Sequence, residues 1–178
     1  MKRIMLAATV GAAFALSGCN AMMADPAPGP VAGGDMTPER AMPYVMMAGA
    51  SDMYEIESAR MALQKSQRQD VRQFAEMLIQ HHNMTTQQVM AAARASGLNP
   101  PPPRLMPMQE NMLARLREAN GAEFDRRFWR QQVRAHEMAL ALHSNYARNG
   151  DRPPLRSAAN GAVPIVTQHL EQARRMDR

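Results

Sequence analysis

Apolar and polar residues alternate with a helical period along most of the chain that follows residue 38. Between residues 69 and 96, for example, Val71, Ala75, Leu78 and Val89 recur at intervals that place them on one face of a helix. Alternating runs of β-branched residues are absent, while Ala, Met, Gln, Arg and Leu dominate. This pattern predicts an all-α protein.

Turn residues divide the periodic region into separate helices. Thr37 and Pro38 fit an N-cap and a first helical position, and Gly97 is typical of a helix end. We expect a break in the first helix near Pro43 or Gly49. The predicted helices span residues 38–66, 69–96, 108–119, 122–148 and 153–176.

The lengths of these helices indicate their arrangement. Four are long, and one short helix lies in the long connection between the second and third of them. This order predicts a four-helix bundle with a crossover helix, as in ferritin-like topology. Because Pro164 lies inside the last helix, we expect a kink there.

The N-terminus has the features of an export signal. Lys2 and Arg3 precede an apolar run from Ile4 to Leu16, which is too short to span a bilayer and is followed by Ser17-Gly18-Cys19. This order resembles a bacterial lipoprotein signal; an ordinary secretory signal or a buried apolar segment would be the alternatives. The resemblance implies cleavage before Cys19, a lipid anchor on its sulfur, and an envelope location on the periplasmic side.

These observations predict three regions. Residues 1–18 would be the signal, residues 19–37 a disordered Pro/Gly-rich tether, and residues 38–178 the helical bundle. Asn20 resembles the residue that directs some lipoproteins to the outer membrane. Lipidation of Cys19, the only cysteine, would leave no thiol for a disulfide or a metal site.

The chain carries a net charge of +5 at neutral pH, and the basic residues are scattered rather than clustered. A solvated mixed-charge surface explains this pattern, and we expect no nucleic-acid partner. In an exported protein, an anionic lipid or polysaccharide surface of the envelope, or an unidentified protein, is the candidate partner besides the membrane itself.

One ionisable residue on each long helix shares a stripe with apolar residues. These residues are Glu55, His82, His136 and His169. Bundle metal sites use ligands from facing helices in this way, and imidazole suits Zn, Cu, Fe or Ni. Since a buried ionisable group is costly alone, they should meet a metal, water or each other. A transition-metal site and a metal-free polar network, with Glu55 paired to a protonated histidine, both remain open.

Several segments resemble the DUF4142 family of bacterial envelope proteins, over about residues 40–176. They are Tyr54-Glu55-Ile56-Glu57, Val71-Arg72-Gln73-Phe74-Ala75, His82, Phe124-Asp125, His136 and Val163-Pro164 with His169-Leu170. The resemblance implies a ferritin-like fold and carries over the same four residues, Glu55, His82, His136 and His169. The family often has an Asp-His pair on the second helix, where His81 stands here in place of the Asp. It has no settled biochemical function.

A second resemblance concerns only the helix that contains His81. Phe74-Ala75-Glu76-Met77 with His81-His82 and Met90-Ala91 is similar to DUF305 proteins, a helical group linked with copper. Met77, His81 and Met84 share a face and are secondary metal candidates, as is His143 on the stripe of His136. Packing methionines and a surface His81 are the alternative interpretation.

Motifs of catalysis are missing from the sequence. No histidine has a glutamate three residues before it, as di-iron bundles require, and Leu140 occupies the place of the second histidine of a His-Glu-x-x-His motif. We therefore expect a non-catalytic binding or structural role at the envelope. The alternative is a periplasmic transition-metal (Cu, Zn or Fe) binding protein that uses the inward-facing His and Glu residues.

Overall fold

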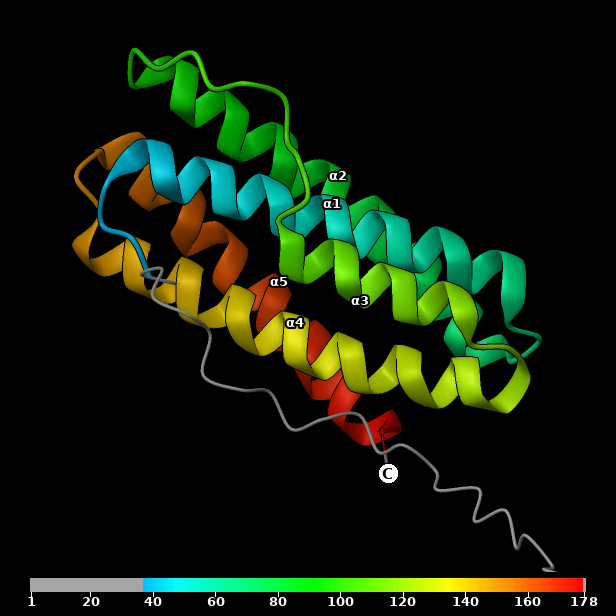
Figure 1. Cartoon of the computed structure of the whole chain (residues 1–178). Coiled ribbons are helices and arrows are strands. Elements are labelled where there is room, and N and C mark those ends of the chain that lie inside the picture. The colour runs from blue at the N-terminus through cyan, green and yellow to red at the C-terminus, as the bar shows by residue number, and fades with distance from the viewer. Residues whose placement is uncertain (1–36, 178) are drawn as a thin grey trace, which may run out of the picture. The chain divides into compact units, whose positions relative to one another are not determined.

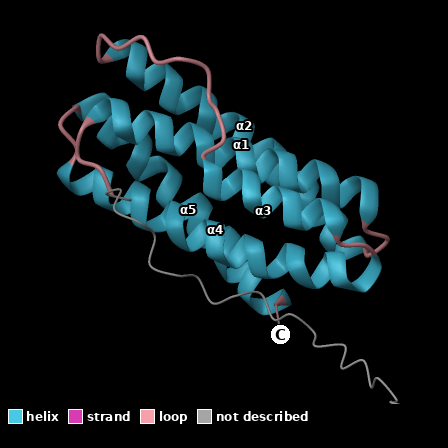
Figure 2. Cartoon of the chain, viewed as in Figure 1, coloured by secondary structure: helices cyan, strands magenta, loops and turns pink. Residues whose placement is uncertain are grey.

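The computed structural model describes residues 37–177, which fold into helices without a strand (Figures 1 and 2). This confirms the all-α prediction. The helices of this part of the chain are α1 (Ala41–Lys65), α2 (Gln69–Ala95), α3 (Pro107–Glu118), α4 (Gly121–Asn149) and α5 (Pro153–Met176).

The helices form two antiparallel pairs (Figure 1). α1 packs most extensively on α2 and α4 on α5, and contacts of α1 with α4 and of α2 with α5 join the pairs. α3 lies in the connection from α2 to α4 and packs on α1 and α4. The predicted four-helix bundle with a short crossover helix is confirmed.

The prediction for the start of the first helix was wrong by three residues. α1 begins at Ala41, and Arg40, not Thr37, is its N-cap. The backbone before it is held extended by the end of α4 and the turn that follows: Asn145 Nδ2 donates to the carbonyl oxygen of Thr37 at 2.7 Å, and Asp151 N donates to that of Glu39 at 2.9 Å. These tertiary bonds favour an extended segment over a further turn of helix.

The break expected in the first helix is also absent, because α1 runs through Pro43 and Gly49. Pro43 lies in the first turn, where its missing N–H removes no helical bond. Gly49 instead allows a close approach: a Cβ there would lie 3.1 Å from Cγ of Pro103. The proline-rich connection before α3 is thereby packed against the middle of α1.

Other predicted boundaries agree closely with the structure. α2 ends one residue before the predicted boundary, and Gly97 follows with a positive φ of 75°, the conformation that glycine adopts most readily. α5 has the predicted bounds and continues past Pro164.

The core consists of two large apolar clusters with polar residues between them. Near the C-terminal end of α1 lie Ala59, Ala62, Phe74, Leu78, Leu116, Phe124, Phe128 and Trp129 with their neighbours. Near the N-terminal end of α1 lie Tyr44, Val45, Ala48, Val89, Leu142, Tyr146 and Leu155 with theirs. The ring contacts of Phe74 with Phe128 and Trp129 show close packing in the first cluster.

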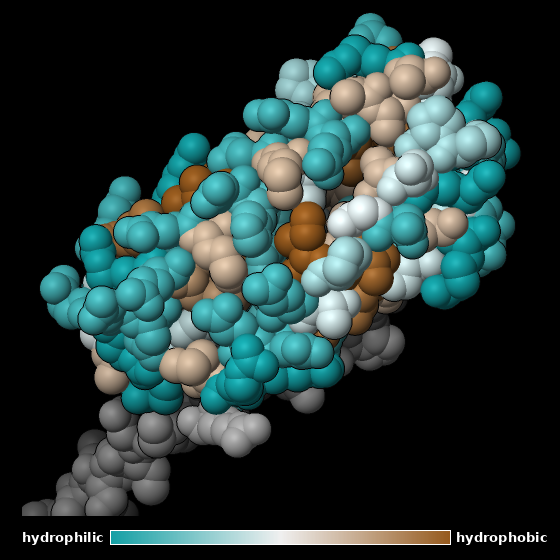
Figure 3. Space-filling view, turned by 180° about the vertical axis from the view of Figure 1, so that it is seen from behind, coloured by the Kyte–Doolittle hydropathy of each residue, from teal (hydrophilic) through white to brown (hydrophobic). Residues whose placement is uncertain are grey.

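The surface is mainly hydrophilic. Seen from behind, charged and polar side chains cover most of the bundle, and more hydrophobic residues appear between them (Figure 3). Among the described residues, no helix is both long and apolar enough to cross a membrane. The predicted signal (1–18), Cys19 and nearly all of the predicted tether lie outside the described residues.

Candidate metal centre

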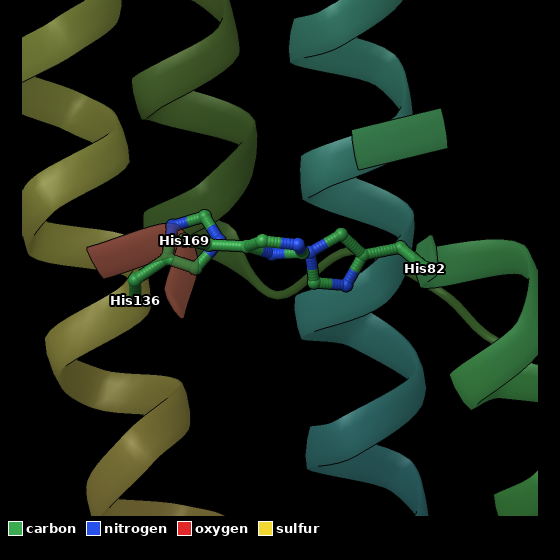
Figure 4. Close-up of side chains that lie close together, drawn as sticks. All are labelled: His82, His136 and His169. Carbon is green, nitrogen blue, oxygen red and sulfur yellow. The ribbon is translucent and has the colours of Figure 1, made fainter. Parts of the chain in front are cut away.

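Three histidines from three helices meet between the apolar clusters. His82 of α2, His136 of α4 and His169 of α5 are buried, and one ring nitrogen of each lies within 4.8 Å of the others. The three rings point toward one another (Figure 4). We call these residues the histidine cluster. Each lies on the inward stripe of its helix, near Leu78 on α2 and Val166 on α5.

An aspartate of α1 orients His82. The His82 Nδ1–H donates to Oδ1 of Asp52 at 2.7 Å, and both side chains are buried. Oδ2 of Asp52 accepts from the hydroxyls of Thr85 at 3.0 Å and Thr86 at 2.8 Å. Because Nδ1 is held in this way, Nε2 of His82 is directed to the cluster, and it has no hydrogen-bond partner.

Electrostatics favours a charged His82 when only the protein is present. Burial lowers the pKa of His82, but the hydrogen bond and charge of Asp52, together with the charge of Glu55, outweigh it, so the pKa is raised overall. The positive charge of His82 in turn acts on its neighbours. Burial, followed by this charge, lowers the pKa of His136 to about 3 and that of His169 to about 2. These two rings are therefore neutral at ordinary pH.

The neutral rings form a directed chain of hydrogen bonds. His136 Nδ1–H donates to the carbonyl oxygen of Gln132 at 2.8 Å, which leaves its Nε2 as an acceptor 3.3 Å from Nδ1 of His169. If His169 donates there, its Nε2 accepts from Nδ1 of His81 at 2.8 Å. These bonds place the proton of His136 on Nδ1 and, in the same arrangement, the proton of His169 on Nδ1 as well.

His81 links the cluster to the surface. Its ring stacks on that of His169, with centroids 5.1 Å apart and planes 8° from parallel. Unlike the residues of the histidine cluster, His81 is partly exposed. At the position where the family resemblance led us to expect an aspartate, a second imidazole contacts His169.

Glu55 lies beside the cluster with its carboxyl group unpaired. It is buried, Oε1 is 3.7 Å from Nδ1 of His136, and neither carboxyl oxygen has a hydrogen-bond partner. Burial raises the pKa of Glu55 to about 8, against the opposing charge of His82. The carboxyl group is therefore protonated over much of the neutral range.

The secondary candidates lie in different surroundings. His143 is buried but pairs elsewhere, with Nδ1 3.0 Å from the hydroxyl of Tyr44, and burial lowers its pKa to about 4. Met77 packs against the apolar cluster that contains Phe74, and Met84 is 40% exposed. A metal role for these residues remains a prediction.

Asp52 is the residue of this layer that sequence reasoning missed as a candidate. It falls on the inward stripe of α1, three residues before Glu55, where Ser51 is an equally good match to the helical period. The hydroxyl pair Thr85-Thr86 on α2 was the remaining signal, because inward-facing hydroxyls need a polar partner and here donate to Asp52.

The fold matches solved structures of a protein named CopM. The Cu(II)-bound form has a TM-score of 0.65 and 21% identity, and covers 78% of this chain and 95% of that one. The Cu(I)-bound form has a TM-score of 0.65 and 23% identity, covering 76% and 94%. An Ag-bound form has a TM-score of 0.64 and 22% identity, covering 76% and 93%. At these identities the likeness shows a shared fold.

Among curated proteins, none matches this chain. The family model described as "Domain of unknown function (DUF4142)", in contrast, matches residues 26–176, which include the whole bundle and the histidine cluster. The chain belongs to the DUF4142 family.

Proposed function

We propose that this chain is an exported envelope protein whose bundle binds a monovalent transition-metal ion, Cu(I), in the histidine cluster. The observation that carries the proposal is the convergence of three buried imidazoles from three helices. This convergence favours a metal-binding role over a purely structural one.

The spacing of the nitrogens suits direct coordination. At metal–nitrogen distances of about 2.0–2.1 Å, two ligand nitrogens are separated by about 3.3 Å in tetrahedral geometry and about 4.1 Å in linear geometry. Nε2 of His136 and Nδ1 of His169 are 3.3 Å apart, so both reach one ion once the proton on Nδ1 of His169 moves to its Nε2. One nitrogen of His82 lies within 4.8 Å of one nitrogen on each of the other two rings, so the rings must move closer together for all three to bind one ion.

The charges favour a monovalent ion. A buried charge is costly unless a partner compensates it, and the carboxylate beside the cluster is that of Asp52, bound to His82. An ion of charge +1 that replaces the proton on His82 keeps this balance, whereas a divalent ion adds a further positive charge. Ionisation of Glu55 could compensate that charge, at the cost of desolvation.

The protein's own groups leave part of this layer without hydrogen-bond partners. Nε2 of His82 and both carboxyl oxygens of Glu55 have no hydrogen-bond partner in the structure. Buried polar groups are almost always paired, so a bound ion or water is needed to complete this layer. The CopM structures, named as Cu(I)-, Cu(II)- and Ag-bound forms, add support because they share the fold.

The proposal is tested by titration of the full chain with Ag(I) and with Cu(I) under reducing conditions. All proteins carry Cys19→Ser, so that the only thiol cannot bind the ion. Asn is the chosen replacement, because its amide N–H lies near Nδ1 of histidine and keeps the bonds to Asp52 and Gln132. The variants are His82→Asn, His136→Asn and His169→Asn, with His143→Asn as the control outside the cluster.

We expect one tightly bound equivalent in the parent chain and in His143→Asn, and its loss in each cluster variant. Circular dichroism checks that every variant is helical. Equal tight binding by the parent and all three folded cluster variants would refute an ion site at this cluster.

We further propose that the bundle is held in the envelope through a lipid on Cys19, facing the periplasm, with the outer membrane as its site in a Gram-negative cell. The support is the order of charged, apolar and small residues before Cys19. Two acyl chains would anchor it stably.

Cys19→Ala should release the protein from membranes; a processed Cys19→Ala protein that stays with the membrane would contradict this. A metal-binding protein at this location suits storage of the ion, its delivery to other proteins, or resistance to an excess of it.

A further inference from the structure

A hollow lined by methionines shares no lining residue with the histidine cluster. It has a volume of about 230 Å³ and lies where α1, α2 and the connection before α3 meet. Its lining includes Met46 and Met47 of α1, Met90 of α2, and Met106, the N-cap of α3. Met46 is 54% exposed and Met106 36% exposed, so thioethers are accessible from solvent.

The rest of the lining offers no ligand for a hard cation. It consists of prolines, Val45, Leu105 and Arg104, without a carboxylate or an imidazole. Thioether sulfur prefers soft ions such as Cu(I) and Ag(I), whereas Zn²⁺, Mg²⁺ and Ca²⁺ prefer nitrogen, thiolate or oxygen ligands. Among metal ions, the thioethers of this hollow suit a soft monovalent ion best, although the guanidinium of Arg104 opposes its charge.

The wall opposite α1 is preformed. Pro101, Pro102 and Pro103 have fixed φ angles, and Pro103 packs on Gly49 of α1. Met106 is held at the start of α3 by its backbone N–H, which donates to Oε1 of Gln109 at 2.9 Å. A site built on such a wall loses little chain entropy when an ion binds.

A smaller hollow adjoins the first and leads along α1. It shares Met47 and Met106 with the first hollow and adds Met138 and Ser51. Ser51 precedes Asp52, the residue that orients His82. Met47 lies five residues before Asp52, about 7.5 Å along the helix axis. The two hollows together thus bring several methionines to one side of α1.

We propose that Met46, Met47, Met90 and Met106 form a second, surface site for Cu(I), which captures the ion before it enters the bundle. The choice of ion rests on the proposed function, but the site itself is separate from the histidine cluster. An apolar ligand is the competing occupant, because flexible methionines also line promiscuous apolar surfaces.

The test uses ¹³C-methyl methionine NMR on the full chain with Cys19→Ser, His82→Asn, His136→Asn and His169→Asn, which lacks both the thiol and the histidine cluster. Added Ag(I) should shift the methyl signals of the four methionines with saturation, while Zn²⁺ should not. Met46→Leu with Met106→Leu should weaken this binding at least tenfold. Met84→Leu with Met176→Leu, the matched control outside the hollow, should leave it unchanged.

Three outcomes would overturn the second site. They are the absence of methyl shifts in excess Ag(I), equal shifts at Met84 and the hollow, and shifts produced only by an apolar dye, which would identify a pocket for apolar ligands. The Met46→Leu, Met106→Leu chain with intact histidines should still bind its interior equivalent. Failure of the interior site and failure of the surface site are therefore distinguishable.

Discussion

Nδ1 of His82 lies 2.7 Å from Oδ1 of Asp52, and the two side chains, 30 residues apart in the chain, are buried between α1 and α2. This contact fixes which nitrogen of His82 faces the histidine cluster. It also supplies the negative charge that compensates a cation in an otherwise apolar core. Carboxylates bonded to ligand histidines commonly play both parts in metal sites.

Asp52→Asn should therefore weaken Ag(I) binding by about 10- to 100-fold, the range typical for loss of such a partner. The amide keeps the size of the side chain but removes its charge. Competition titration measures the effect, and Asp125→Asn, a buried aspartate beside the distant Phe124 cluster, is the control. Unchanged affinity in Asp52→Asn would show that this carboxylate does not support the ion.

Metal affinity should depend on pH through His82. Asp52 and Glu55 raise the pKa of His82 above its usual 6.5 despite burial, and its Nε2 must lose a proton to bind an ion. Affinity for Ag(I) should fall about tenfold per pH unit below that raised pKa and level off above it. In Asp52→Asn the pKa is no longer raised by the carboxylate, so the fall should begin at lower pH. A pH-independent affinity across this window would contradict proton competition at His82.

Acid should destabilise the ion-free protein through its neutral buried histidines. The pKa values of His136, His143 and His169 lie at about 3, 4 and 2 in the fold, against 6.5 for an ordinary histidine. Their contribution to stability is complete above 6.5 and is lost as the pH falls below it, because the unfolded chain binds protons that the fold excludes. His82 acts in the opposite sense, since its raised pKa contributes stability below 6.5 that is lost as the pH rises.

His143→Asn removes one of these three buried histidines and leaves the histidine cluster unchanged. Below pH 6.5 the decline of its unfolding free energy should be shallower than that of the parent by up to about 1.4 kcal/mol per pH unit. Urea unfolding at several pH values gives these slopes. Equal slopes would mean that His143 is not held neutral by the fold.

Glu55 should limit stability on the alkaline side. Its pKa of about 8 exceeds the ordinary 4.5, so the stability it contributes is complete below 4.5 and is lost as the pH rises through 8. The free energy of unfolding of Glu55→Gln, measured with urea, is therefore compared with that of the ion-free parent at pH 5 and at pH 8. The difference should favour the variant more at pH 8 than at pH 5. Glu137→Gln, an exposed glutamate paired with Arg174, should show no such gain. A pH-independent difference between Glu55→Gln and the parent would contradict a protonated carboxyl group in the fold.

The helical period was sufficient to predict the bundle and the inward positions of Glu55, His82, His136 and His169. A stripe fixes direction around a helix but not height along the bundle, so the sequence left open whether the three rings would meet. Ser51 and Asp52 match the inward stripe of α1 equally well. Only packing against α2 selects Asp52 as the partner of His82. The start of α1 was mispredicted because tertiary bonds from Asn145 and Asp151 compete with local capping.

The most direct test is X-ray absorption of the Cys19→Ser chain loaded with one equivalent of Cu(I). The account predicts a first shell of nitrogen only, at about 2 Å and with outer imidazole scattering, and loss of this signal in the chain with His82→Asn, His136→Asn and His169→Asn. A sulfur shell at about 2.3 Å in the parent, or an unchanged spectrum after the three substitutions, would contradict binding by the histidine cluster.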